Sequence, residues 1–181
     1  MLVRRMTLAP LIHRITHEIQ PVYYDRVYKL PKSFFKKPKW HFNWFEIIQS
    51  NDQEVYALRL SSDDSIQGFI SIQKQFSDKF VKINLVESAP WNVGRHSKQW
   101  IAAGQMLFAI GCKISFECDF DGFVYFVSKT KLKSHYEEVL NAKSLAKDSL
   151  RMHIDTLSAT RLIRMFDFMT EKEIAIWIKR S

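Results

Sequence analysis

Two runs of alternating residues in the middle of the chain constrain its fold more than any other feature. Residues 66–75 read IQGFISIQKQ and residues 79–87 read KFVKINLVE. The positions that form the apolar side of these runs are Ile66, Gly68, Ile70, Ile72, Val81, Ile83 and Leu85. Because successive side chains of a strand point to opposite faces, each run predicts a strand with one apolar face. The two runs flank FSDK at 76–79, so we expect an antiparallel hairpin whose other face is solvated.

Three more strands are predicted outside this hairpin, at residues 55–60, 122–129 and 151–155. The second of them, GFVYFVSK, is apolar on both faces, which is typical of a buried central strand. No repeat, low-complexity linker or other boundary divides the chain. We therefore expect a single domain over residues 1–181.

Helices are predicted between and after these strands. The first carries apolar residues at helical spacing, and these are Leu107, Ile110, Ile114 and Cys118. The others are TKLKSHYEEVLN at 130–141, SATRLIRMFDF at 158–168 and TEKEIAIWIKRS at 170–181. Asn141 is a plausible C-terminal stop, and Thr170 with Glu173 forms a capping-box pattern. The order of elements predicts an α/β or α+β fold with a mixed, mostly antiparallel central sheet flanked by helices.

The N-terminal region, residues 1–50, is basic, aromatic and punctuated by Pro21, Pro31 and Pro38, which argue against a long helix. Between Lys29 and Phe45, lysines alternate with phenylalanines and tryptophans. One interpretation is nucleic-acid binding, with lysines on phosphates and aromatic rings on bases. The other is that the aromatic residues cover the open side of a sheet while the lysines are solvated. The sequence leaves both interpretations open.

Charge and composition limit the partners and the location of the chain. Its net charge is +8 and its pI is about 9.5, which suggests an acidic partner: a nucleic acid, an anionic membrane surface or a phosphorylated small molecule. No apolar run approaches a membrane span and no signal-peptide pattern is present, so we expect a cytoplasmic protein that does not cross a membrane. Cys112 and Cys118 lie in one helical segment and are expected to be reduced structural thiols, and the scattered histidines predict no metal site.

One of only five glycines lies in the stretch QWIAAGQM at 99–106, just where a helix is expected to begin. The first turn of a helix has unpaired N–H groups and the positive end of the helix dipole, so it suits a phosphate. Small residues at 102–104 let such a ligand approach the backbone. Upstream, Arg95 and Lys98 add positive charge.

Three features together resemble the GNAT superfamily of N-acetyltransferases, over about residues 56–166. The first is the order of the elements. The second is a match of Gln99, Ala102 and Gly104 to the family's pyrophosphate loop, with Ala102 where the family has its first glycine. The third is the pair Tyr136 and Glu137 in the late helix, although Asn141-Ala142 does not match the Gly-aromatic pair that commonly ends this helix in the family. The segment between Glu87 and Gln99 is longer than the family's usual gap, which suggests an insertion at the rim of the acyl-donor cleft.

The resemblance implies an acyltransferase that moves an acetyl group from acetyl-coenzyme A, its co-substrate, to an amine. The acceptor would be a small molecule, a protein or an RNA-linked amine. The chain would have an acetyl-coenzyme A-binding core at 55–168. An alternative is a non-catalytic coenzyme A-binding or nucleic-acid-binding regulatory module on the same fold. The residues implied for binding the co-substrate are Leu85, Val86, Arg95, Lys98, Gln99, Trp100, Ile101, Ala102, Ala103 and Gly104.

Acetyl transfer to an amine needs a base for the ammonium proton, donors for an oxyanion and an acid for the departing sulfur. Glu87 is the candidate base because it ends a predicted strand where Val86 breaks the alternation. The other interpretation is an ordinary glutamate at a strand end that faces solvent. That break also suggests a bulge or a splayed strand, which would expose a backbone N–H between Leu85 and Ser88 to the oxyanion. Tyr136 is the candidate acid by its resemblance to the family's late helix. Its spacing from Leu132 and Val139 also fits a core position.

Overall fold

The computed structural model describes residues 6–36, 39–94 and 98–167, and the helix expected at 170–181 lies outside them. Its strands are β1 (Met6–His13), β2 (Ile19–Arg26), β3 (Glu54–Leu60), β4 (Ile66–Gln75), β5 (Phe80–Ser88), β6 (Trp100–Ile101), β7 (Val124–Val127), β8 (Lys143–Ser144) and β9 (Arg151–Ile154). Its α-helices are α1 (Trp44–Gln49), α2 (Ala103–Glu117), α3 (Lys133–Leu140) and α4 (Thr156–Asp167). Short 3-10 turns lie at Lys32–Phe35, Pro90–Asn92 and Thr130–Leu132.

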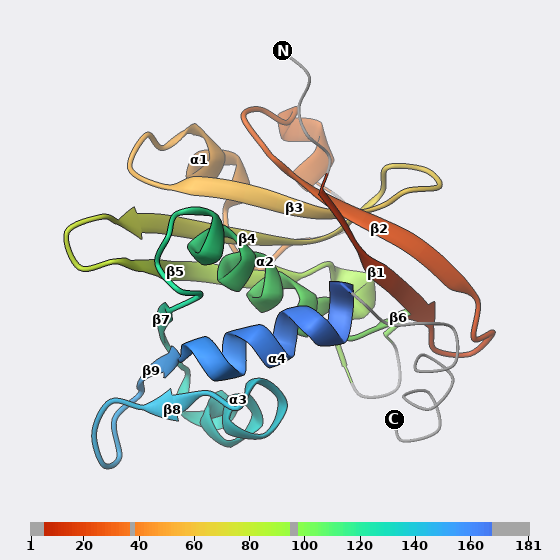
Figure 1. The fold of residues 1–181 in the computed structure, drawn as a ribbon. Helices are drawn as coiled ribbons and strands as arrows, with labels where there is room; N and C mark the ends of the chain where they lie inside the picture. The colour runs from red at the N-terminus through yellow and green to blue at the C-terminus, as the bar shows by residue number, and fades with distance from the viewer. Residues whose placement is uncertain (1–5, 37–38, 95–97, 168–181) are drawn as a thin grey trace.

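The strands form one sheet in the order β6-β1-β2-β3-β4-β5-β7-β9-β8 (Figure 1). All neighbours in the part described are antiparallel except β5 and β7, which are parallel. The expected mixed, mostly antiparallel sheet flanked by helices is confirmed, as is the β4–β5 hairpin. The crossover from β5 to β7 contains β6 and α2, because parallel neighbours need a long connection.

The main core lies between the sheet and one layer of helices. Ile70 and Ile72 of β4 and Val81 of β5 pack in one cluster with α2 and α4, including Leu107 and Leu162. Figure 1 shows α2 and α4 together in front of the sheet. No helix among the residues described is long and apolar enough to cross a membrane.

Two bulges change the faces that the sequence pattern predicted for the hairpin. In β4 the pairing with β3 shifts between Ile66 and Gly68, and in β5 the pairing with β4 shifts between Ile83 and Leu85. Each bulge adds one residue to its strand and reverses the alternation beyond it. Ile66 and Leu85 therefore pack on the opposite face of the sheet from Ile70. Assigning all the alternating residues to one face was wrong for these two positions.

The second face of the hairpin is covered, so the expectation of a solvated face was also wrong. Trp40 and Trp44 of the N-terminal region pack around Phe69 of β4, with ring centroids 4.8 and 5.0 Å from it. Phe69 and Trp44 are both 0% exposed. We call this the outer cluster, and its buried members are Val27, Trp40, Trp44, Ile48, Val55, Ala57, Ile66, Phe69 and Ala89. The aromatic residues of this region thus cover the sheet, as one of the two interpretations expected.

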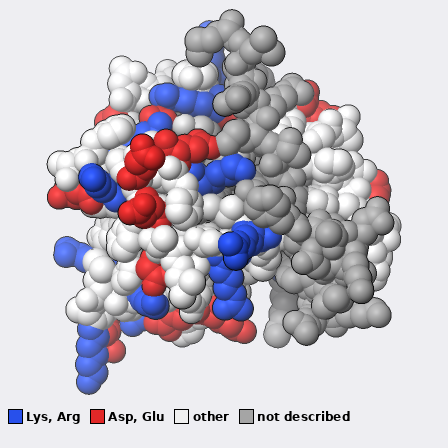
Figure 2. All heavy atoms as spheres, viewed as in Figure 1, with Lys and Arg blue, Asp and Glu red and all other residues white. Residues whose placement is uncertain are grey.

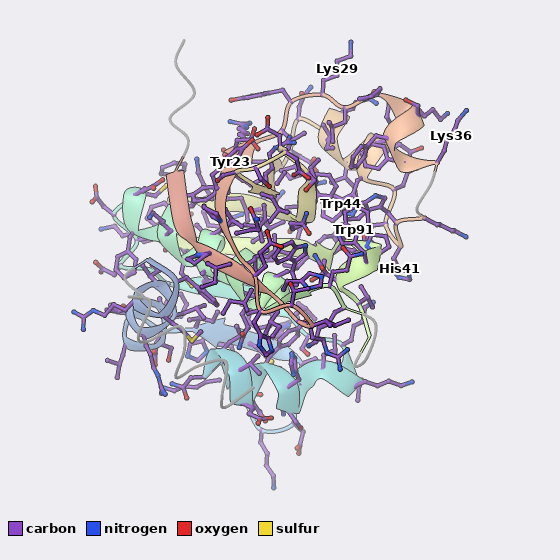
Figure 3. All side chains as sticks on the ribbon, turned by 90° about the vertical axis from the view of Figure 1, so that its right-hand side faces the viewer. Tyr23, Lys29, Lys36, His41, Trp44 and Trp91 are labelled. Carbon is purple, nitrogen blue, oxygen red and sulfur yellow. The ribbon has the colours of Figure 1, made fainter. Side chains whose placement is uncertain are left out.

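The lysines beside the outer cluster point to solvent. Lys29, Lys32, Lys36 and Lys39 are exposed, and in Figure 3 Lys29 and Lys36 extend away from the body while Trp44 lies inside it. Burial removes Trp40 and Trp44 from stacking on bases, which is one of the contacts that the nucleic-acid interpretation uses. On the face seen in Figure 2, basic and acidic side chains are interspersed.

The sequence pattern did not predict β1 and β2. They form an antiparallel pair that extends the sheet beyond β3. Each contains a proline, Pro10 and Pro21, and both lie at the irregularity between the pairs Leu8–Val22 and Leu11–Gln20. A proline cannot donate to a ladder, so strands accept it where the ladder is already interrupted.

Gly68 provides a test of how closely β4, β5 and α2 pack. A Cβ at this position would lie 2.8 Å from the carbonyl oxygen of Glu87 and 2.7 Å from Cδ1 of Leu107. Because the first contact is with backbone, we expect Gly68→Ala to lower the free energy of unfolding by about 1–3 kcal/mol. Denaturant unfolding measures this change.

Gly104→Ala is the matched control, since its Cβ would meet only Ser88 Oγ, at 3.4 Å. We expect it to leave the free energy of unfolding nearly unchanged. Equal stability of the two variants would contradict the close approach of β5 to Gly68.

Candidate functional site

The backbone of β5 has two neighbours over only part of its length. It pairs with β7 from Val81 to Ile83, opposite residues 124–126, whereas it pairs with β4 as far as Ser88. Beyond Ile83, the edge of β5 that faced β7 has no strand partner among the residues that the structure describes. Successive backbone N–H groups point to alternate edges, so part of the 84–88 segment directs donors toward this opening. The bulge in β5 lies at the start of the 84–88 segment, and the broken alternation in the sequence had suggested such a bulge.

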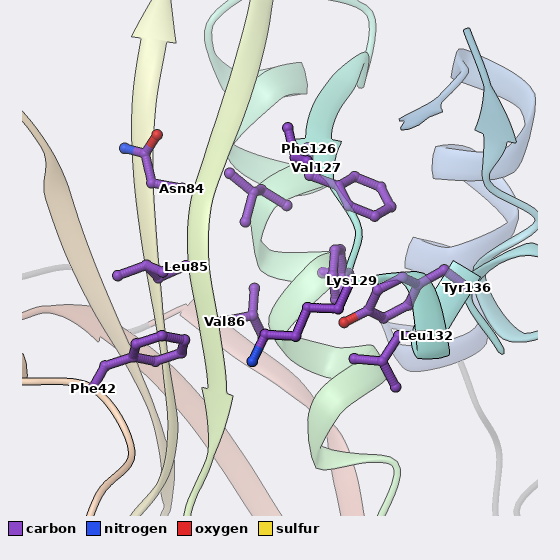
Figure 4. Close-up of a pocket in the computed structure, with 11 residues that line it drawn as sticks. Phe42, Asn84, Leu85, Val86, Phe126, Val127, Lys129, Leu132 and Tyr136 are labelled. Carbon is purple, nitrogen blue, oxygen red and sulfur yellow. The ribbon is translucent and has the colours of Figure 1, made fainter. Parts of the chain in front are cut away.

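A cleft occupies the opening between β5 and β7, and it has two adjoining hollows. The inner hollow has a volume of about 140 Å³ and includes Asn84, Leu85 and Val127 in its walls (Figure 4). The outer hollow has a volume of about 570 Å³ and reaches Gly104 at the start of α2. The residues that line both are Phe42, Val86, Phe108, Lys129, Leu132 and Tyr136. Val127 was expected to be buried as part of a central strand, but it is 61% exposed because it lies at this opening.

The N-terminus of α2 forms one end of the outer hollow. Ala102 precedes the helix in the left-handed conformation, with φ 65°, and its carbonyl oxygen accepts the first helical hydrogen bond, from Met106 N–H at 3.0 Å. The N–H groups of the first turn, at residues 103–105, precede that bond and have no acceptor within the helix. Gly104 and Gln105 line the hollow. Since a Cβ on Gly104 would meet almost nothing in the protein, packing does not explain this glycine, and the space beside it is open to a ligand.

Glu87 lies near the end of β5, and three N–H groups donate to its carboxylate. They are the backbone N–H groups of His41 and Phe42, at 2.5 and 3.2 Å, and the indole Nε1–H of Trp44, at 2.6 Å. The carboxylate therefore ties the segment 41–44 to β5. His41 and Phe42 are placed as a wall of the cleft by these bonds.

Tyr136 lies between the two hollows, and its hydroxyl points into the cleft (Figure 4). Its ring is held by Phe108 and Phe126, with centroids 5.2 and 5.4 Å away. Burial raises the pKa of the Tyr136 hydroxyl above its ordinary value. The group therefore stays protonated at neutral pH and can donate a proton in the cleft.

The structure brings five of the predicted site residues into this cleft: Leu85, Val86, Glu87, Gly104 and Tyr136. The others form its surroundings or lie elsewhere. Trp100 and Ile101 pair with β1, and the Gln99 carbonyl accepts the backbone N–H of Arg14. Lys98, Ala102 and Ala103 are not among the lining residues of the two hollows. Arg95 lies outside the residues described.

Sequence reasoning missed Phe42, Lys129 and His135 as lining residues. Lys129 is separated from the end of β7 only by Ser128, so its place near the opening could have been inferred from the strand that precedes it. No local signal placed Phe42, because its position depends on hydrogen bonds to Glu87, which is 45 residues away along the chain.

No family model and no curated protein matches the chain. Among solved structures, it is similar to GCN5 from Tetrahymena, at 11% identity and a TM-score of 0.43, covering 61% of this chain and 74% of that one. It is similar to a nourseothricin acetyltransferase at 12% identity and a TM-score of 0.42, covering 84% and 88%. A cAMP-binding acyltransferase from Mycobacterium smegmatis is similar at 12% identity and a TM-score of 0.46, covering 95% of this chain and 53% of that one. The likeness is one of fold alone.

Proposed function

We propose that the chain is an N-acetyltransferase that moves an acetyl group from acetyl-coenzyme A to the nitrogen of an amine. The observation that carries this proposal is the divergence of β5 from β7. It leaves a cleft that runs from the N-terminus of α2, at Gly104, to the hydroxyl of Tyr136. Helix N–H groups that would suit an anion, strand N–H groups that would suit an oxyanion and the hydroxyl of the half-buried Tyr136 lie along this opening.

The walls of the cleft fit acetyl-coenzyme A as a co-substrate. Its pyrophosphate would lie at the first turn of α2, where the N–H groups and the helix dipole favour an anion. Its less polar arm would pass along Phe108, Leu132 and Val139, which line the outer hollow. This arm would bring the thioester to the free edge of β5.

In the reaction, the amine nitrogen bonds to the carbonyl carbon of the acetyl group and the carbon–sulfur bond breaks. The ammonium loses one proton before attack, and the nitrogen loses a second as the amide forms. The departing sulfur gains one, so one proton is released overall. Backbone N–H groups of β5 between Leu85 and Ser88 would stabilise the negative charge on the carbonyl oxygen. Tyr136 would donate the proton to sulfur, and Glu87 would accept the proton from the amine directly or through water.

Gly104→Glu tests the binding of acetyl-coenzyme A. A carboxylate at the start of α2 would meet the pyrophosphate, and like charges repel, so we expect binding to weaken about tenfold or more. Isothermal titration calorimetry measures the affinity. Ser61→Glu, in the exposed turn after β3, adds the same charge away from the cleft and should keep the wild-type affinity. Equal affinity of the two variants would remove α2 as the phosphate site.

Tyr136→Phe tests the acid. The variant keeps the ring between Phe108 and Phe126 but cannot give a proton, so we expect kcat to fall about 10²–10⁴-fold with nearly unchanged coenzyme binding. Release of free thiol reports turnover. Tyr125→Phe is the matched control, because Tyr125 packs against Phe80 and is not among the residues that line the cleft. A wild-type rate for Tyr136→Phe, with chemistry rate-limiting, would return Tyr136 to a purely packing role.

Glu87→Gln tests the two roles proposed for this carboxylate, as the anchor of the segment 41–44 and as the base. An amide would place its NH₂ group against N–H donors, so we expect the free energy of unfolding to fall by about 1–3 kcal/mol. Glu46→Gln, on the exposed side of α1, makes the same chemical change and should have little effect on stability.

The pH profile of Glu87→Gln separates the base from the structural role. If Glu87 accepts the amine proton, the loss in kcat/KM is largest at low pH, where most of the acceptor is protonated. A loss that is constant across pH would leave Glu87 as an anchor of the segment 41–44 and assign the base elsewhere.

A further inference from the structure

We propose that the acceptor amine carries an oxyanion group, a carboxylate or a phosphate, and that Lys129 binds it. This inference rests on the proposed acetyl transfer and names the substrate class of the same cleft. It is drawn from the acidic, basic and imidazole side chains that line the two hollows, which are Glu87, Lys129, His41 and His135.

The negative charge in the cleft belongs to a carboxylate that already accepts hydrogen bonds from the protein. Glu87 is the one acidic residue among the described residues that line the two hollows, and three N–H groups donate to it. These donors occupy most of the acceptor sites of the carboxylate, and the proposed proton transfer from the reacting amine would use the remainder. The cleft is therefore a poor site for an acceptor with several positive charges.

Positive charge in the cleft, by contrast, is available. Lys129 is exposed and forms no ion pair with any carboxylate among the residues described. Its ammonium lies 5.5 Å from the centroid of the Phe42 ring, which is a cation–π contact. In Figure 4 the side chain extends from the end of β7 across the opening. The contact thus holds a positive charge in place between β7 and the wall that Glu87 anchors.

The position of Lys129 separates this charge from the phosphates of the co-substrate. Lys129 lines both hollows, whereas Gly104 lines only the outer one. The proposed pyrophosphate site at α2 has backbone donors of its own, so it does not need this lysine. An anion on Lys129 would lie toward the inner hollow, beside the free edge of β5. An amine a few bonds from that anion can reach the thioester at this edge.

His41 and His135 also line the outer hollow, and neither supplies a negative charge. Discrimination would come from both attraction and repulsion: an oxyanion meets Lys129, whereas an amine with a second positive charge meets the same ammonium.

Matched pairs of acceptors test the inference in a thiol-release assay with acetyl-coenzyme A. One pair is phenylalanine and phenylalaninamide, another is O-phosphoethanolamine and ethanolamine, and spermidine represents a polycation. We expect the anionic member of at least one pair to have a kcat/KM at least about tenfold above that of its neutral partner, and spermidine to be the poorest. Which pair shows the difference tells whether the group is a carboxylate or a phosphate.

Lysine variants locate the effect. Lys129→Gln should reduce the difference within the preferred pair to less than about twofold, and Lys129→Arg should keep most of it. Lys131→Gln removes the same charge from an exposed neighbour that is not among the lining residues, and it should keep the full difference. Calorimetry with acetyl-coenzyme A alone should give similar affinities for all four proteins.

The outcomes separate this inference from the proposed function. Turnover of spermidine or of the neutral partners at least as good as that of the anionic members would overturn the inference and leave acetyl transfer standing. A difference that persists in Lys129→Gln would do the same for the role of Lys129. Binding of acetyl-coenzyme A without thiol release for any of these amines would overturn the inference alone. No binding of acetyl-coenzyme A would contradict the proposed function, and the inference would fall with it.

Discussion

β5 pairs with β4 over a longer stretch than with β7, and the cleft depends on this difference in pairing. Its pairing with β4 continues to Ser88, but its pairing with β7 ends at Ile83. The bulge that begins at the same point turns Leu85 toward the outer cluster and returns Val86 to the main core. A regular strand would keep one apolar face along its whole length. The bulged strand instead contributes to both cores and still leaves one edge for chemistry.

The outer cluster turns this open strand into a cleft with two sides. Trp44 and Trp40 remove Phe69 from water, and burial of aromatic side chains of this size dominates the stability of such a layer. Hydrophobic burial has no direction, so it cannot by itself fix where the segment 41–44 lies along β5. The three hydrogen bonds to Glu87 supply that direction. Phe42 is therefore positioned by a polar contact within an otherwise apolar layer.

Periodicity predicted what is local in this fold. The helical spacing around Leu107 and Ile110 predicted α2, and Asn141, in the left-handed conformation with φ 51°, ends α3 as expected. The faces of Ile66 and Leu85 were mispredicted because a bulge depends on the partner strand as well as on the strand itself. Nor did the pattern predict β1 and β2, because their prolines weaken the strand signal and are tolerated only through the irregular pairing of these two strands.

The same distinction between local and long-range features applies to the residues of the candidate site. Gly104 and Tyr136 were predicted because a motif marks each of them, and both line the cleft. Phe42 and Lys129 belong to segments nearly 90 residues apart in the chain, and their contact exists only once β5 and β7 have diverged between them.

The residues brought together only by the fold would bear on the choice of acceptor. In the proposed function, the sheet, α2 and Tyr136 would provide acetyl transfer in general, whereas the N-terminal segment and the residues after β7 add further walls to the cleft. Selection among acceptors on one scaffold depends on such added walls. Exchange of the segment 41–44 would then alter which amine is accepted and leave the binding of acetyl-coenzyme A at α2 in place.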